Sequence, residues 1–139
     1  MYISKHFALH ELVPSSIFEA LGIRAWELLD ERLLVTLDAL REHFGPCTVN
    51  NWRDGGPYRE SGFRTFESTT GVKFSQHRYG RAADCKFATV TPVEASAYIV
   101  ANAEKFRLLT TLEDVAATPT WLHVDVRLNR TTGVRIVKP

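Results

Sequence analysis

The chain has 139 residues, of which 45% are hydrophobic and 24% are charged, and its 17 basic and 16 acidic side chains leave a formal net charge of +1. This length and composition fit one globular domain and exclude a disordered chain, and the near-neutral charge gives no reason to expect nucleic acid as a partner. No apolar run approaches the roughly 18 residues of a membrane span, so none is expected. Cys47 and Cys85 form no C-x-x-C pattern, which excludes a disulfide framework and favours a reducing compartment.

Apolar periodicity and end signals predict the helices. A short helix or turn is expected over Pro14–Leu21. A longer helix begins near Trp26, carries apolar residues at spacings of three and four, and ends at the Gly45-Pro46 pair. The capping box Thr91–Glu94 starts another helix, which we expect to run to about Lys105.

Short segments rich in β-branched or alternating residues predict five strands: Cys47–Trp52, Ala83–Phe87, Leu108–Glu113, Trp121–Arg127 and Val134–Val137. The turn Asn129–Gly133 favours a hairpin between the last two of them. Asn51–Ser75 is a long irregular segment, and loops of that length in compact domains are usually functional. We therefore predict a single α+β domain over residues 1–139, with helices packed on one face of a mainly antiparallel sheet.

Strand alternation separates polar from apolar side chains at two of these strands. Within Trp121–Arg127, His123 and Asp125 lie on the face opposite three apolar residues, and an ordinary half-buried strand does not require this arrangement. The same parity places Asp84 opposite Cys85, which then becomes a core thiol. We expect Asp84 and His123 to face a common site.

His77, Asp84 and His123 offer two imidazoles and one carboxylate. This set leaves a fourth position on Zn²⁺ open for water in catalytic sites. Gly80 would let the chain turn between the first two of these ligands. The residues therefore predict one zinc ion per chain, and Asp125 is expected to orient a ligand imidazole or an arginine rather than to bind the metal.

The chain resembles the M15 peptidases in a spaced motif, Ser75-x-His77-x-x-Gly80-x-Ala82-x-Asp84, and in the later pair His123-x-Asp125. That family joins zinc D-Ala-D-Ala carboxypeptidases, D-Ala-D-Ala dipeptidases and phage L-alanyl-D-glutamate endolysins in one fold with the hedgehog signalling domain. The upstream Ser61-Gly62-Phe63-Arg64 is similar to the family's Ser-Gly-Tyr-Arg element. The resemblance extends over roughly residues 50 to 127.

The resemblance implies the hedgehog and DD-peptidase fold, one zinc held by His77, Asp84 and His123, and cleavage of peptide bonds in the stem of bacterial peptidoglycan. It also implies that Arg64 and Ser75 line the substrate subsites, and Arg64 would help to polarise the scissile carbonyl. The bond that is cut stays open among L-Ala-D-Glu, D-Ala-D-Ala and a cross-bridge.

One position departs from the family pattern. The peptidases commonly carry an acidic general base three residues before the last histidine, where this chain has Thr120. A hairpin through Val115–Thr120 would bring Glu113 or Asp114 beside His123 instead, and we favour Glu113 because it closes a strand. The alternative to a peptidase is a catalytically inactive phage structural or binding module that retains the zinc-peptidase fold.

The N-terminal residues lack a basic segment followed by an apolar stretch, so we expect synthesis in the cytoplasm without a signal peptide. Together with the small size, this suits a phage or prophage protein that reaches the cell wall after phage-assisted release or as part of the virion. The sequence does not distinguish a lysis enzyme from a virion component.

Overall fold

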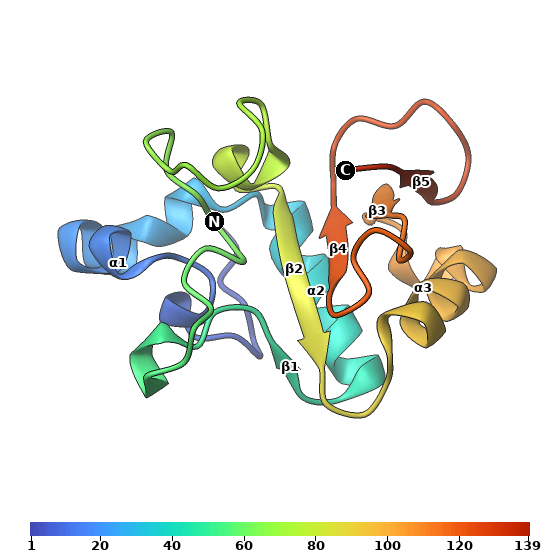
Figure 1. Ribbon diagram of the computed structural model, residues 1–139, viewed down its shortest axis with the longest axis horizontal. Coiled ribbons are helices and arrows are strands. Elements are labelled where there is room, and N and C mark those ends of the chain that lie inside the picture. The colour runs from blue at the N-terminus through green and yellow to red at the C-terminus, as the bar shows by residue number, and fades with distance from the viewer.

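The periodic and alternating segments form three α-helices and five strands in the computed structural model, which describes residues 1–139 (Figure 1). The α-helices are α1 (Ser15–Leu21), α2 (Glu31–Phe44) and α3 (Pro92–Ala101). The strands are β1 (Cys47–Thr48), β2 (Ala82–Phe87), β3 (Thr111–Glu113), β4 (Leu122–Asp125) and β5 (Arg135–Val137). Segments of 3-10 helix are η1 (Leu9–Glu11), η2 (Gly22–Leu28), η3 (Trp52–Asp54), η4 (Gln76–Tyr79) and η5 (Ala103–Phe106).

The strands make one sheet in the order β1-β2-β4-β3-β5. Three neighbouring pairs are antiparallel and the β3–β5 pair is parallel, which confirms the α+β class and the mainly antiparallel sheet. The predicted hairpin between the last two strands is wrong. Both edges of β4 are already paired, to β2 and β3, so the chain crosses over after β4 and adds β5 beside β3.

The long helix starts later than its apolar pattern predicts. Asp30 is extended and its side chain accepts a hydrogen bond from the Arg32 N–H at 3.0 Å, so α2 begins at Glu31 rather than near Trp26. Trp26 lies in the 3-10 turn η2 and is buried, so it contributes to the core without belonging to the helix. The helix ends as expected at Gly45, whose φ is +82°.

The capping box at α3 is confirmed, but the predicted length of the helix is not. Thr91 Oγ1 accepts a hydrogen bond from the Glu94 N–H at 3.2 Å, and the Glu94 carboxylate accepts one from the Thr91 N–H at 2.8 Å. Asn102 leaves helical geometry and its side chain donates to the Tyr98 carbonyl, so α3 stops at Ala101 and does not reach Lys105.

The first and third strands are shorter than predicted because neighbouring backbone groups bond elsewhere. β1 stops at Thr48, and the N–H groups of Asn50 and Asn51 donate to Glu11 and Tyr58 instead of extending the strand. β3 begins at Thr111 because the residues before it make a turn in which the Leu109 N–H donates to the Phe106 carbonyl.

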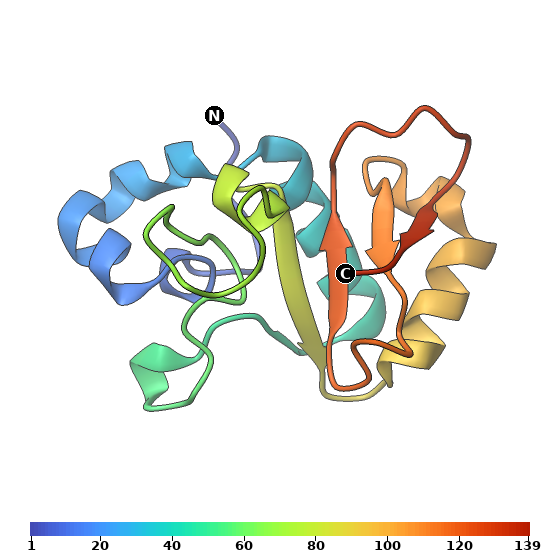
Figure 2. The same ribbon diagram turned by 45° about the horizontal axis from the view of Figure 1, so that its top comes forward.

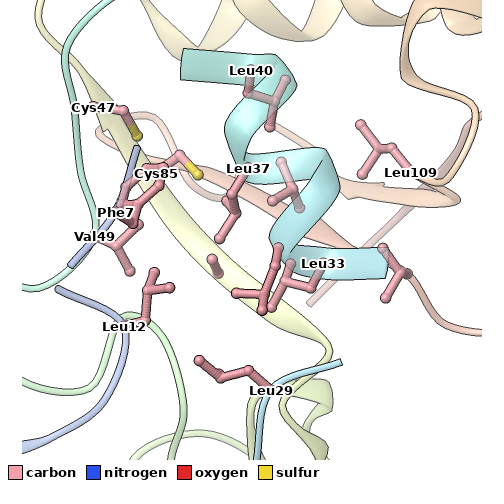
Figure 3. Packing of buried hydrophobic residues seen from close by; sticks show 14 of the residues in the cluster. Phe7, Leu12, Leu29, Leu33, Leu37, Leu40, Cys47, Val49, Cys85 and Leu109 are labelled. Atoms are coloured by element: carbon pink, nitrogen blue, oxygen red, sulfur yellow. The ribbon is translucent and has the colours of Figure 1, made fainter. Parts of the chain in front are cut away.

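Twenty-five buried apolar residues form one core between the sheet and α2. α2 lies behind β2 and β4 in Figure 1, and Figure 3 shows Leu37 of this helix directed toward Cys85, with Leu33 and Leu40 on the neighbouring turns. Cys47 and Cys85 are buried free thiols in this core. α3 flanks β3 (Figure 2). No helix is long and apolar enough to cross a membrane. The face of the sheet opposite α2 carries polar side chains.

Candidate metal centre

Two strands and a 3-10 turn bring three metal-ligating side chains together. Asp84 on β2 and His123 on β4 are direct cross-strand partners. They project from the face opposite Cys85 and Leu122, which belong to the core, as strand alternation predicts. His77 reaches the same point from η4. All three side chains are buried, and they form a group that could hold a metal ion.

The three ligand atoms are nearly equidistant. His77 Nε2 lies 3.3 Å from Asp84 Oδ1 and 3.3 Å from His123 Nδ1, and His123 Nδ1 lies 3.0 Å from Asp84 Oδ1. Tetrahedral bonds to zinc of about 2.0 Å place neighbouring ligand atoms about 3.3 Å apart. The separations therefore suit one small, tetrahedrally bound cation.

The outer nitrogen of each imidazole is committed to an oxygen acceptor. His77 Nδ1 lies 2.7 Å from the Gly62 carbonyl oxygen, and His123 Nε2 lies 3.1 Å from Asp125 Oδ2. Only an N–H can bond to these oxygens, so each outer nitrogen carries a hydrogen. The inner nitrogens are then the ones that can offer lone pairs to a metal, an arrangement typical of ligating histidines.

Asp125 lies against the outer side of His123, away from the ligand atoms. Its carboxylate is fully buried and also accepts hydrogen bonds from Arg127, through Nε at 2.9 Å and the backbone N–H at 3.1 Å. Burial favours the neutral acid, but the bonds from His123 and Arg127 outweigh it and hold the pKa of Asp125 below its ordinary value. Asp125 is thus an ionised partner that fixes the His123 ring.

Burial and hydrogen bonding shift the pKa values of the ligands in different directions. Burial lowers the pKa of His77. It acts in the same direction on His123, but hydrogen bonds to Asp125 and Asp84 outweigh it and raise the pKa of His123 to about 9. Burial opposes ionisation of Asp84, yet hydrogen bonds from both histidines bring its pKa well below the ordinary value. The carboxylate is therefore charged at neutral pH.

Arg64 is bound to the second oxygen of Asp84. Its Nη2 donates to Asp84 Oδ2 at 3.0 Å, and its Nε donates to the Glu60 carbonyl at 2.7 Å. The segment that carries Arg64 runs beside β2, because the Asp84 N–H donates to the Ser61 carbonyl at 2.7 Å. The Ser61–Arg64 element thus supplies both the Gly62 carbonyl for His77 and the guanidinium for Asp84.

Two glycines let the chain around the site pass close to the backbone of the N-terminal region. A Cβ at Gly62 would lie 2.2 Å from the Leu12 carbonyl oxygen, and one at Gly80 would lie 1.9 Å from the Leu28 carbonyl oxygen. Gly80 also has a φ of +66°, which side-chain-bearing residues rarely adopt. Gly80 therefore makes the turn between η4 and β2 as the sequence predicts, while the role of Gly62 as a hydrogen-bond partner of His77 could not be read from spacing.

The ligand group opens into a cavity of about 330 Å³. Arg64 and Ser75 line it on the side of the long irregular segment, and Thr118 and Trp121 line it on the side of the β3–β4 loop. Arg64 and Ser75, the expected subsite residues, are thus brought together with His77, Asp84 and His123 in one cavity.

The structure separates the two acidic residues that end β3. Glu113 lines the cavity, and its Oε1 lies 3.8 Å from His123 Nδ1. Asp114 instead accepts a hydrogen bond from the Ala116 N–H at 3.0 Å and lies by α3 in a different surface hollow. Thr120 is exposed. Glu113 is therefore the carboxylate placed beside the ligand group.

The chain was compared with protein-family models, curated proteins and solved structures, and none of them matches it. The candidate site is therefore described by its geometry alone. It is a buried His-Asp-His group that could hold a metal ion, in a cavity that is also lined by an arginine and a second acidic side chain.

Proposed function

We propose that this chain is a zinc-dependent peptidase that cleaves peptide bonds in the stem of bacterial peptidoglycan. One observation supports the proposal above the others. Three potential ligand atoms lie within 3.0–3.3 Å of one another, and the outer nitrogens of both imidazoles are committed to other acceptors. The resemblance of the motif from Ser75 to Asp84 to the M15 peptidases supports the substrate class.

Zinc is the metal that this donor set favours, and His77, Asp84 and His123 would hold it. Two imidazoles and one carboxylate at these separations match catalytic zinc sites with three protein ligands, whereas Mg²⁺ and Ca²⁺ prefer more oxygen ligands. Bound there, zinc would supply Lewis acidity to polarise a carbonyl group and would lower the pKa of a water molecule.

Glu113 would act as the general base. Its Oε1 lies 3.8 Å from His123 Nδ1, in the wall of the same cavity. From there the carboxylate would accept a proton from the attacking water and pass it to the leaving amine. Asp84 is the other carboxylate of the cavity, and it is already paired with Arg64 and with both histidines.

Arg64 and Ser75 would bind the peptide. The guanidinium is buried and held at two of its nitrogens, so its remaining donors are fixed in direction beside the ligand group. A preorganised cation there would stabilise the negative charge that develops on the carbonyl oxygen. Ser75 would add a hydroxyl from the opposite end of the segment that begins at Ser61.

A catalytically inactive binding module is the second candidate, and Thr120 favours it. A threonine cannot act as the base that the M15 peptidases commonly have at that position. Such a module would keep the zinc and the cavity and would bind peptidoglycan without cutting it. The resemblance includes phage endolysins, so in either case we propose a phage or prophage protein that is made in the cytoplasm and acts on the cell wall.

The deciding experiment is digestion of purified peptidoglycan by the zinc-loaded protein, with new amino termini detected by mass spectrometry. The proposal expects new termini, and their masses identify the bond among the three that the sequence leaves open. The His123→Ala variant is the control and is expected to release none. If the protein with one zinc per chain co-sediments with peptidoglycan but releases no termini, the binding module replaces the peptidase.

A further inference from the structure

Lys86 follows Asp84 by two residues on β2, so both side chains lie on the same polar face of the sheet. The ammonium group is half-buried and contacts uncharged groups. Lys86 Nζ donates to Ser61 Oγ at 3.0 Å and to the Asp84 carbonyl oxygen at 3.0 Å, and it lies 4.1 Å from the centroid of the Tyr58 ring. Partial burial of a cation costs free energy, which charge-assisted hydrogen bonds and an aromatic face offset.

The ammonium group lies where the edge of β2 loses its strand partner. The last pair between β1 and β2 joins Thr48 to Lys86, so β1 does not reach Asp84. The Asp84 N–H donates to the Ser61 carbonyl at 2.7 Å instead. The N–H and C=O of one strand residue point to the same side, so the Asp84 carbonyl also faces the segment that carries Ser61. By bonding to this carbonyl and to the Ser61 hydroxyl, Lys86 joins β2 to that segment.

Ser61 is held on β2 by two hydrogen bonds, one at its carbonyl and one at its hydroxyl. The next residue is Gly62, whose carbonyl oxygen lies 2.7 Å from His77 Nδ1. The orientation of Ser61 therefore fixes the acceptor that orients the His77 ring. Lys86 does not line the cavity, so its effect on the ligand group passes through this segment.

We propose that Lys86 is a positioning residue that raises the affinity of the metal centre for zinc. It acts through the Ser61 hydroxyl, which holds the Gly62 carbonyl on the His77 ring. The inference rests on the zinc site of the proposed function. Partners that orient ligating histidines commonly change metal affinity 10–100-fold when they are removed, and Lys86 lies one contact further out, so we expect an effect of about 10-fold.

The test is a competition titration of zinc against a chelator. Lys86→Met keeps the length of the side chain without the ammonium group and should raise the Kd for zinc about 10-fold. Ser61→Ala breaks the same link and should raise the Kd by a similar factor. Because both changes act through one contact, the double variant should bind no more than about twofold more weakly than either single variant.

Lys105→Met is the matched control. Lys105 Nζ also donates to an uncharged oxygen, Tyr98 Oη, at 2.8 Å, and it lies 5.4 Å from the centroid of the Tyr98 ring. Lys105 lies beside α2 and η5 in a surface hollow that contains none of the three ligands. Its replacement should therefore leave the Kd for zinc unchanged.

Cobalt spectra separate a positioning role from a structural one. Co²⁺ bound in place of zinc reports the ligand geometry by its visible absorption bands, which Lys86→Met should change and Lys105→Met should not. An unchanged cobalt spectrum in Lys86→Met would overturn the inference. So would a Kd for zinc within about twofold of wild type, even with a lower thermal midpoint, or losses that multiply in the double variant.

Ser61→Ala decides the question if Lys86→Met does not fold. Weaker zinc binding with altered cobalt bands in Ser61→Ala would support the inference, and wild-type affinity would overturn it. If the wild type binds no zinc, the proposed function fails together with the inference. If the wild type binds zinc and Lys86→Met binds it equally well, the inference alone fails.

Discussion

Replacing Glu113 by Gln should abolish most of the proposed peptidase activity and leave zinc binding unchanged. Gln keeps the shape of the side chain but cannot accept the proton. General acid–base catalysis contributes about 10²–10⁴-fold to rate. Asp84 is the one other acidic side chain that lines the cavity, and it is engaged by Arg64 and both histidines, so it is not free to replace Glu113. We therefore expect a loss of about 10³-fold in kcat, which corresponds to about 4 kcal/mol of activation free energy.

The assay follows release of amino termini from purified peptidoglycan, with zinc per chain measured on the same samples. Zinc content should remain near one, since Glu113 is not among the three grouped ligands. Asp114→Asn is the matched control, because the Asp114 side chain lies away from the cavity, and it should retain full activity. Wild-type activity in Glu113→Gln would refute the assignment of the base. An inactive Asp114→Asn beside an active Glu113→Gln would assign that role to Asp114.

Three further outcomes follow from hydrogen bonds at Asp125, His123 and Asp38. Asp125→Asn removes the charge that fixes His123 and should weaken zinc affinity about 10–100-fold in a competition titration with a chelator, while an unchanged affinity would contradict the role of Asp125. Hydrogen bonds to Asp125 and Asp84, acting against burial, raise the pKa of His123 to about 9, so zinc must displace a proton at neutral pH. Calorimetry in buffers of different ionisation enthalpy should detect about one proton released per zinc at pH 7. The affinity for zinc should fall about tenfold for each pH unit below 9, and a titration without proton release would refute this. Asp38 accepts hydrogen bonds from Tyr2, Ser4 and two backbone N–H groups of the N-terminal segment, so Asp38→Ala should lower the free energy of unfolding by about 3 kcal/mol. Burial raises the pKa of Asp38, but these bonds outweigh it and lower the pKa below 3.8, so the stabilisation should be complete above that pH and decline as the pH falls further. Denaturant unfolding of the wild type and of Asp38→Ala at pH 7 and pH 3 checks this, and an equal loss of unfolding free energy at both pH values would contradict it.

Strand alternation in the sequence was sufficient to predict that Asp84 and His123 share a face. The period of a strand determines which side chains share a face, so the alternation around Asp84 and His123 placed both on the side opposite the core before any pairing was known. The same reasoning does not supply strand order. β5 pairs with β3 because β4 has neighbours on both edges, and a turn-forming sequence after β4 carries no information about which edge is free.

Residue spacing in the sequence does not predict the contacts that complete the site. The Gly62 carbonyl bonds to His77 because the Ser61–Arg64 segment runs beside β2, and backbone acceptors have no sequence signature of their own. Helix ends deviated for a similar reason, because Asp30 and Asn102 form local side-chain bonds that override the apolar period.

Zinc stoichiometry tests the central claim most directly. Elemental analysis of the protein after zinc supplementation and removal of free metal should give about one zinc per chain. His123→Ala should bring this value close to zero. His43→Ala should leave it at one, because His43 lies away from the site. Its ring stacks on that of Tyr98, with 4.2 Å between ring centroids, among the aromatic side chains of Phe44 and Phe106. A wild-type value that stays near zero, or a His123→Ala variant that still binds one zinc, would contradict the assignment of His77, Asp84 and His123 as a zinc site.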